Sequence, residues 1–328
     1  MRSANTYVAV ALAALAITTI MPTRGAAQAF ITSWGGYGTA DGQFLTPQGV
    51  AVGGSGDVYV MDGDNNRVSV FTSDGVFLRK WSASPDPSGA RAIAVDANDN
   101  VYVLDYSDAR ILRFTSTGTL VTQWNPSPGG RPGFGIAVSS SGSVYVTVSN
   151  RIREFTGSGV FVREWGSSGR DDGEFQTPDG LAVDAEGNVY VADKFNSRVQ
   201  KFTSTGSFLT KWGSEGTADG QFRGPRRVAV GAGGIVYVVD GGNVRVQAFT
   251  SVGTFITKWG SQGTAPGQFD NPIGIAVDAR GDIYVADTNN SRIQKFAPGM
   301  PTHVQYVAWG AMKSRYRGER GAAQPQER

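Results

Sequence analysis

The sequence GDIYVADTNNSRIQKF, residues 281–296, decides the fold because it is repeated along the chain. Close copies are GNVYVADKFNSRVQKF at 187–202 and GDVYVMDGDNNRVSVF at 56–71. Each copy joins two short apolar runs through a polar turn, which is the pattern of two β-strands. A binding site is usually made once in a chain, whereas a structural unit is made many times. The polar residues of this stretch are therefore expected to belong to the framework.

Tryptophan marks the period of the repeat. The successive spacings are 47, 43, 41, 47, 47 and 50 residues, between Trp34, Trp81, Trp124, Trp165, Trp212, Trp259 and Trp309. Self-similarity at about 40 to 50 residues is typical of propellers and solenoids. Each unit has a Gly-rich loop after the Trp, followed by four strand-like runs separated by turn residues. Seven marks enclose six units, and such small units bury their faces only by packing against one another around an axis.

The pattern resembles the NHL repeat. The residues that carry the resemblance are Gly-x-Phe-x-x-Pro-x-Gly-Ile-Ala-Val-Asp and then Tyr-Val-Ala-Asp-x-x-Asn-x-Arg-Val-Gln-x-Phe, over roughly residues 30–309. The resemblance implies an all-β, six-bladed β-propeller of four-stranded antiparallel blades. The strands of a blade run from inner a to outer d, and the d–a and b–c loops share one face, the top. Because FITSW at 30–34 nearly copies FITKW at 255–259, we expect the N-terminal strand to complete the last blade, with 303–309 beside or beyond it.

Two charged positions recur with the repeat. An arginine occupies one of them in all six units, at Arg67, Arg110, Arg151, Arg198, Arg245 and Arg292. An aspartate occupies the other in five units, at Asp62, Asp105, Asp193, Asp240 and Asp287, with Val148 in the third unit. We expect Asp and the neighbouring Asn to cap backbone N–H groups of the b–c turn, and Arg to bridge the carboxylate and nearby carbonyls. The Trp residues are expected to pack blade against blade rather than to bind a sugar.

The second and third units depart from the repeat. Sixteen residues separate the Trp from the first residue of the inner apolar run in four units, for example Trp34 to Val50, but only twelve do so in these two. The third unit also lacks two residues in its b–c turn. All three deletions fall on the top face. They predict a notch in that face over blades 2 and 3.

Candidate ligand contacts are the residues of the top face that do not repeat. The start of strand a carries six different residues: Gln48, Arg91, Phe134, Asp179, Arg226 and Ile273. Cationic and aromatic side chains at a concave mouth are suitable anchors for a protein or a small ligand. The alternative is that these are ordinary variable loop tips. The predicted ligand-binding set is Gln48, Arg91, Tyr106, Arg131, Phe134, Asp179, Lys194, Phe195, Arg226 and Arg227.

The two ends of the chain differ from its repeat region. Residues 1–29 have the layout of a secretory signal peptide, with an apolar run at 8–21 and the small residues Ala27 and Ala29 before a cleavage point. We therefore expect a secreted or periplasmic monomer, with an uncleaved anchor helix as the alternative. After Ala29 the chain has 28 basic and 28 acidic residues, which disfavours a nucleic-acid partner. The basic segment 310–328 is predicted to be disordered.

The residue inventory limits the chemistry. The chain has one histidine, His303, and no cysteine, which excludes a three-His zinc site and a Cys nucleophile. Similar six-bladed propellers include peptidyl-hydroxyglycine lyase and lactonases. The resemblance therefore leaves open a metal-assisted lyase or hydrolase that uses a Ca²⁺-type ion at the channel mouth. The leading hypothesis is a binding module that uses its top face near blades 2 and 3, without catalytic residues or a required cofactor; a structural Ca²⁺ in the channel is left open.

Overall fold

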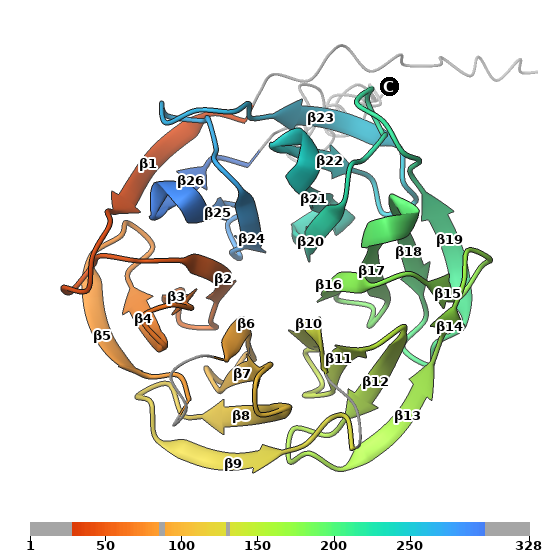
Figure 1. The fold of residues 1–328 in the computed structure, drawn as a ribbon, viewed down its shortest axis with the longest axis horizontal. Coiled ribbons are helices and arrows are strands. Elements are labelled where there is room, and N and C mark those ends of the chain that lie inside the picture. Colours follow the sequence, from red (N-terminus) through yellow and green to blue (C-terminus); the bar gives the residue numbers. More distant parts are fainter. Residues whose placement is uncertain (1–27, 85–88, 129–131, 299–328) are drawn as a thin grey trace, which may run out of the picture.

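The predicted six-bladed propeller is confirmed. A computed structural model describes residues 28–84, 89–128 and 132–298. In these residues the strands form six four-stranded antiparallel sheets, which stand as blades around a common axis (Figure 1). No helix in the same three ranges is long and apolar enough to cross a lipid bilayer. The apolar run at 8–21, the segment 303–309 and the tail 310–328 lie outside the described residues.

The blades share one strand order. The inner strands a are β2 (Pro47–Val52), β6 (Ala90–Val95), β10 (Pro132–Val138), β16 (Pro178–Val183), β20 (Pro225–Val230) and β24 (Pro272–Val277). The strands b are β3 (Val58–Asp62), β7 (Val101–Asp105), β11 (Val144–Val148), β17 (Val189–Asp193), β21 (Val236–Asp240) and β25 (Ile283–Asp287). The strands c are β4 (Arg67–Phe71), β8 (Arg110–Phe114), β12 (Arg151–Phe155), β18 (Arg198–Phe202), β22 (Arg245–Phe249) and β26 (Arg292–Phe296). The outer strands d are β5 (Phe77–Ser82), β9 (Leu120–Trp124), β13 (Phe161–Trp165), β19 (Phe208–Trp212), β23 (Phe255–Trp259) and, for blade 6, β1 (Phe30–Gly35).

Short elements lie in the loops of the top face, apart from one in an a–b turn. They are the strands β14 (Ser167–Ser168) and β15 (Glu174–Phe175) and the 3₁₀ turns η1 (Lys194–Asn196), η2 (Ala232–Gly234, the a–b turn of blade 5), η3 (Gly241–Asn243) and η4 (Thr288–Asn290). In blades 1, 2, 4, 5 and 6, strand a begins three residues before the apolar run by which the sequence marks it. In blade 1, for example, it begins at Pro47 rather than Val50. The pairing register shifts just after Pro47, so this first residue belongs to the strand without continuing its regular ladder.

The core lies between blades. Every strand b is buried along its whole length, as in β3 and β17. In a strand d such as β19, partly buried side chains alternate with exposed ones, because successive residues point to opposite faces of the sheet. Each hydrophobic cluster of the described residues draws on two adjacent blades. The cluster of Tyr59 and Met61, for example, also contains Val103 and Phe114 of blade 2. No blade buries its faces alone, which is why the ring must be complete.

Tryptophan joins each blade to the next, as the sequence predicts. Trp81 lies edge-on to Tyr59 of its own blade, with ring centres 6.4 Å apart, and it tilts against Phe114 of blade 2 at 6.2 Å. The other five described Trp residues repeat this arrangement. Trp309 lies outside the described residues.

The N-terminal strand closes the ring, which confirms the prediction for 30–34. Strand β1 pairs antiparallel with β26, with Trp34 opposite Ile293. Figure 1 shows β1 at the rim outside β26 and next to the blade that contains β2. The Thr288 hydroxyl also donates a 2.7 Å hydrogen bond to the Pro47 carbonyl of blade 1.

Candidate functional site

The repeated Asp and Arg hold the top-face loops to the blades. In blade 4, Arg198 Nε donates to Asp193 Oδ2 at 2.8 Å, and its other two nitrogens donate to the carbonyls of Arg170, Asp171 and Glu174. Asp193 in turn accepts a 2.8 Å bond from the Gln176 N–H. These residues therefore anchor the preceding d–a loop as well as the b–c turn, so their role is wider than the one predicted. Blades 1, 5 and 6 have the same clamp.

The clamp changes in blades 2 and 3, where the d–a loops are short. Arg110 keeps its 3.1 Å bond to Asp105, but it bonds the Ser84 hydroxyl and the Asp108 carboxylate in place of loop carbonyls. Arg151 has no aspartate at the end of strand b; it pairs with Glu164 and its side chain is 51 % exposed. The four long loops each add a parallel bridge or short parallel pair beside a fully buried Phe, which is Phe44, Phe175, Phe222 or Phe269.

The channel is closed by an apolar ring. Each inner strand contributes one branched side chain at the same position: Val50, Ile93, Ile136, Leu181, Val228 and Ile275. These six residues, with Arg227 and small neighbours, enclose a cavity of only about 60 Å³. Such a space holds no more than a few water molecules. The channel at the level of this ring therefore has no room for a ligand larger than a few water molecules.

A charge network occupies one side of the mouth. Arg227 donates to the Asp179 carboxylate at 2.7 Å and to the Asp179 carbonyl at 3.1 Å. Lys194 Nζ lies 3.6 Å from the second carboxylate oxygen. Burial lowers the pKa of the Arg227 guanidinium; the Asp179 carboxylate opposes this shift and the charge of Arg226 adds to it. The negative charge of Asp179 is thus neutralised by two cations, Arg227 and Lys194. Arg226 lies close enough for its positive charge to lower the pKa of Arg227.

Three of the predicted residues form a stack between blades 2 and 3. The ring of Tyr106, which follows β7, is stacked on Phe134 of β10, with centres 5.1 Å apart and planes 11° from parallel. The guanidinium of Arg91, from β6, lies 5.3 Å from the centre of the Tyr106 ring. Arg91 is exposed, and both rings are half-buried. The structure therefore brings together two strand-a positions and one b–c turn position in an Arg–aromatic–aromatic arrangement.

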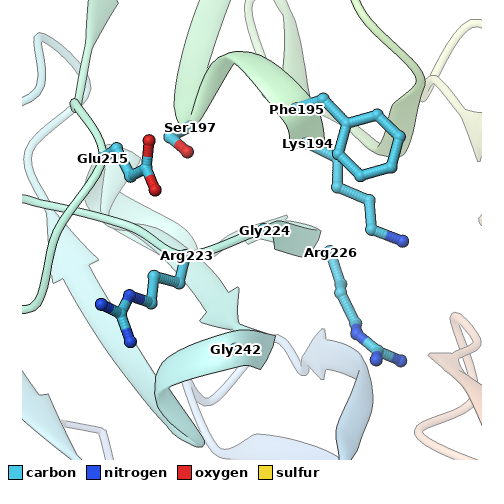
Figure 2. Close-up of a pocket in the computed structure, with 8 residues that line it drawn as sticks. All are labelled: Lys194, Phe195, Ser197, Glu215, Arg223, Gly224, Arg226 and Gly242. Atoms are coloured by element: carbon cyan, nitrogen blue, oxygen red, sulfur yellow. The ribbon is translucent and has the colours of Figure 1, made fainter.

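A cavity of about 370 Å³ lies between the top loops of blades 4 and 5. Figure 2 shows Lys194 and Phe195 on one wall, Ser197 and Glu215 beside them, and Arg223 and Arg226 on the opposite side. A second cavity of about 490 Å³ shares Phe195, Ser197 and Glu215 with it and includes Arg170. The two adjoining cavities are here called the cationic groove.

The predicted site residues therefore separate into groups. Arg91, Tyr106 and Phe134 form the stack; Asp179, Lys194 and Arg227 form the network; Lys194, Phe195 and Arg226 line the cationic groove. Gln48 is half-buried beside Gly63 in blade 1 and belongs to none of these groups. Arg131 lies outside the described residues. Sequence reasoning missed Arg170, Glu215 and Arg223. Comparing the long d–a loops with one another could have found them, because these charges stand at non-repeating positions.

Carboxylates do not gather into a metal site in the described part of the chain. Across those residues no group of three or more His, Cys, Asp or Glu is placed to hold an ion. At the channel mouth Asp179 is bordered by two cations, Arg227 and Lys194. Positive neighbours repel a Ca²⁺-type ion, so this carboxylate does not fit the metal site that the sequence left open.

A protein-family model, the NHL repeat, matches residues 44–71, 175–202, 222–249 and 269–296. These are blades 1, 4, 5 and 6, the four with the complete arginine clamp. A matching curated protein is the B-box type zinc finger protein ncl-1 of Caenorhabditis elegans, 48 % identical over 44 residues, which are 13 % of this chain and 5 % of that protein. The chain thus spans a small part of this relative.

Solved structures of similar shape include several enzymes. A streptogramin B lyase superposes with a TM-score of 0.60 at 16 % identity, over 80 % of this chain and 96 % of its own. Virginiamycin B lyase from Staphylococcus aureus gives 0.57 at 18 % identity, over 77 % and 95 %. A gluconolactonase from Xanthomonas campestris gives 0.59 at 15 % identity, over 84 % and 99 %. Identities this low show a common fold and nothing finer. The chain therefore contains four NHL repeats within a six-bladed β-propeller fold.

Proposed function

We propose that this protein is an exported, monomeric binding module that captures a protein or a small ligand on its top face at blades 2 and 3. The stack of Arg91, Tyr106 and Phe134 carries the proposal. Aromatic and Arg side chains are enriched among the residues that contribute most of the binding energy at interfaces, and an aromatic ring provides a large contact area. A flat ring pair topped by a cation also suits a ligand with its own planar or anionic group.

The division between repeated and non-repeated residues supports the same function. The repeated Arg, Asp, Trp and Tyr residues are engaged in clamps and in contacts between blades. The stack uses only positions that vary from blade to blade, and it stands where the d–a loops are shortest. Recognition is therefore assigned to residues that the framework does not need.

A metal-assisted lyase or hydrolase is the rival hypothesis. The pairing of Asp179 with Arg227 and Lys194 disfavours a cation at the channel mouth. Elemental analysis of the purified protein separates the two functions. Stoichiometric metal that resists dialysis, with turnover abolished by a chelator, would support the enzyme; chelator-insensitive ligand capture supports the binding module.

The test compares two double variants in capture from an extracytoplasmic extract of the source cells. Arg91→Ala with Phe134→Ala removes the cation and one ring of the stack. Arg280→Ala with Phe161→Ala removes the same two residue types at exposed sites elsewhere, since Phe161 is 52 % exposed on an outer strand. We expect capture to fall at least tenfold for the stack variant only. Equal capture by wild type and both variants would refute this site.

A further inference from the structure

We propose that the cationic groove over blades 4 and 5 binds an acidic peptide segment. The groove is lined by Arg170, Lys194, Arg223 and Arg226, with Phe195 and the single carboxylate Glu215. This inference rests on the proposed binding function and deepens it, because it adds a second contact surface and names the chemistry of the ligand.

The first argument is uncompensated charge. Among the described residues, no ion pair or hydrogen bond engages the guanidinium groups of Arg170, Arg223 or Arg226. The one carboxylate near Lys194 in the described residues is Asp179, at 3.6 Å. By contrast, three exposed lysines of the described residues have close carboxylates: Lys80 with Asp41 at 2.6 Å, Lys211 with Asp172 at 2.5 Å and Lys258 with Asp219 at 2.6 Å. An excess of unpaired arginine in one hollow favours an anionic ligand, which two-pronged guanidinium groups bind well.

The second argument is the placement of an apolar side chain within the charge. Phe195 is 65 % exposed at the tip of η1, between the two cavities, and Lys194 Nζ lies 5.7 Å from its ring centre. The Phe195 ring offers apolar contact area at a place where the neighbouring side chains are cationic. A ligand that combines carboxylates with an apolar side chain would use both features.

The third argument is extent. The two cavities, of about 370 and 490 Å³, share one wall and run from the outer side of blade 4, at Trp212, to Arg226 at the start of β20. Two adjoining cavities of these volumes can hold a segment of several residues, whereas a single ion would fill only a small part of them. A nucleic acid needs a broad basic face, whereas the chain after Ala29 has 28 basic and 28 acidic residues. A peptide with a few carboxylates is therefore the ligand that the groove favours.

The inner end of the groove is closed to further anions. Arg227 would be the next cation toward the channel, but it is already bonded to Asp179. Below it the apolar ring leaves only the cavity of about 60 Å³. The peptide is therefore expected to lie across the top of blades 4 and 5 without threading the channel.

The experiment measures binding of two fluorescein-labelled peptides by fluorescence anisotropy. One has four glutamates around one phenylalanine, and the other has four glutamines around one phenylalanine. We expect the glutamate peptide to bind at least tenfold tighter, and its affinity to fall as salt is raised from about 50 to about 300 mM. Equal binding of both peptides would overturn the proposal.

Two triple variants with the same change in net charge locate the effect. Lys194→Gln, Arg223→Gln and Arg226→Gln neutralise the groove, whereas Lys80→Gln, Lys258→Gln and Arg280→Gln remove three charges from other surfaces. The groove variant should lose at least tenfold in affinity and the control less than twofold. Equal losses would mean general charge attraction and would overturn the site. Both variants should remain folded at the temperature of the binding assay, since neither removes a clamp arginine, and their unfolding midpoints check this.

Two further measurements separate this inference from the proposed function. If the groove variant still captures the natural ligand while the stack variant does not, the binding module stands and the groove inference fails. If an oligothymidylate of matched charge binds the wild-type protein more tightly than the glutamate peptide, the groove recognises phosphates and the peptide proposal is wrong.

Discussion

Gly118 of blade 2 lies flat against the indole of Trp81 in blade 1, so closely that a Cβ on this glycine would stand 2.5 Å from Trp81 Cδ2. Its backbone has φ of +90°, a conformation that other residues adopt only with strain. Four other pairs make the equivalent contact: Gly75 with Trp34, Gly159 with Trp124, Gly206 with Trp165 and Gly253 with Trp212. The c–d turn of each of these blades therefore covers the Trp of the preceding one.

Gly118→Ala should lower the free energy of unfolding by about 3 kcal/mol, because it adds overpacking against Trp81 to backbone strain. Gly56→Ala is the matched control, since Gly56 has φ of +87° but no atom within 4 Å of its Cβ position. That control should cost about 1 kcal/mol from strain alone. Urea unfolding monitored by Trp fluorescence gives both values. Equal costs would show that the Trp contact adds nothing.

Arg198→Lys should destabilise the protein by about 2 to 4 kcal/mol. Lysine cannot span Asp193 and three carbonyls at once, and Asp193 is fully buried. Arg151→Lys at the same position of blade 3 should cost less than about 0.5 kcal/mol, because Arg151 is half exposed and has no aspartate partner on strand b. Thermal unfolding of the two variants checks the difference, and similar losses would contradict the clamp.

Ala109→Gly should stabilise the protein by about 0.5 to 1 kcal/mol. Ala109 precedes the clamp arginine of blade 2 with φ of +51°, which glycine adopts without strain. Ala279→Gly is the control at an exposed turn position that has no positive φ, and it should destabilise by a similar amount through added freedom of the unfolded chain. Differential scanning calorimetry should give melting temperatures that shift in opposite directions.

Alkaline pH should unfold the protein through its buried tyrosines. Burial is the largest cause that raises the pKa of Tyr102 to about 12; the Arg113 charge opposes this shift and the Asp96 carboxylate adds to it. Burial alone raises the pKa of Tyr237 to about 12. The unfolded chain ionises at a pKa of about 10, so this stability is complete below pH 10 and is lost between pH 10 and about 12. The loss is about 1.4 kcal/mol per tyrosine for each pH unit.

Unfolding midpoints measured from pH 8 to 12 check this dependence. The double variant Tyr102→Phe and Tyr237→Phe should show a shallower fall between pH 10 and 12, with the same profile below pH 10. A profile identical to that of the wild type would show that these two phenols do not contribute.

The periodic part of this molecule could be predicted from its sequence. The Trp spacing predicts the number of blades, and the near-copy of FITKW at 30–34 predicts the closing strand, because both signals repeat along the chain itself. The inner apolar run by itself puts the start of strand a three residues too late in most blades, because the first residues of the strand, such as Pro47 and Gln48, do not continue that run. The residues of the cationic groove could not be grouped from sequence. Arg170 and Arg226 stand 56 positions apart in sequence, and only the packing of blade 4 on blade 5 brings their loops together.

The bond from Thr288 to the Pro47 carbonyl joins residues 241 positions apart, and β1 has no partner until β26 exists. Of the described strands, β1 is synthesised first, yet it is the last to find its partner. Until β26 has formed, β1 remains an open edge that can pair with a strand of another chain. The entropy cost of so long a closure slows this final step. Chains that terminate before blade 6 should therefore accumulate as aggregation-prone intermediates with an unpaired β1, and the cell must degrade them.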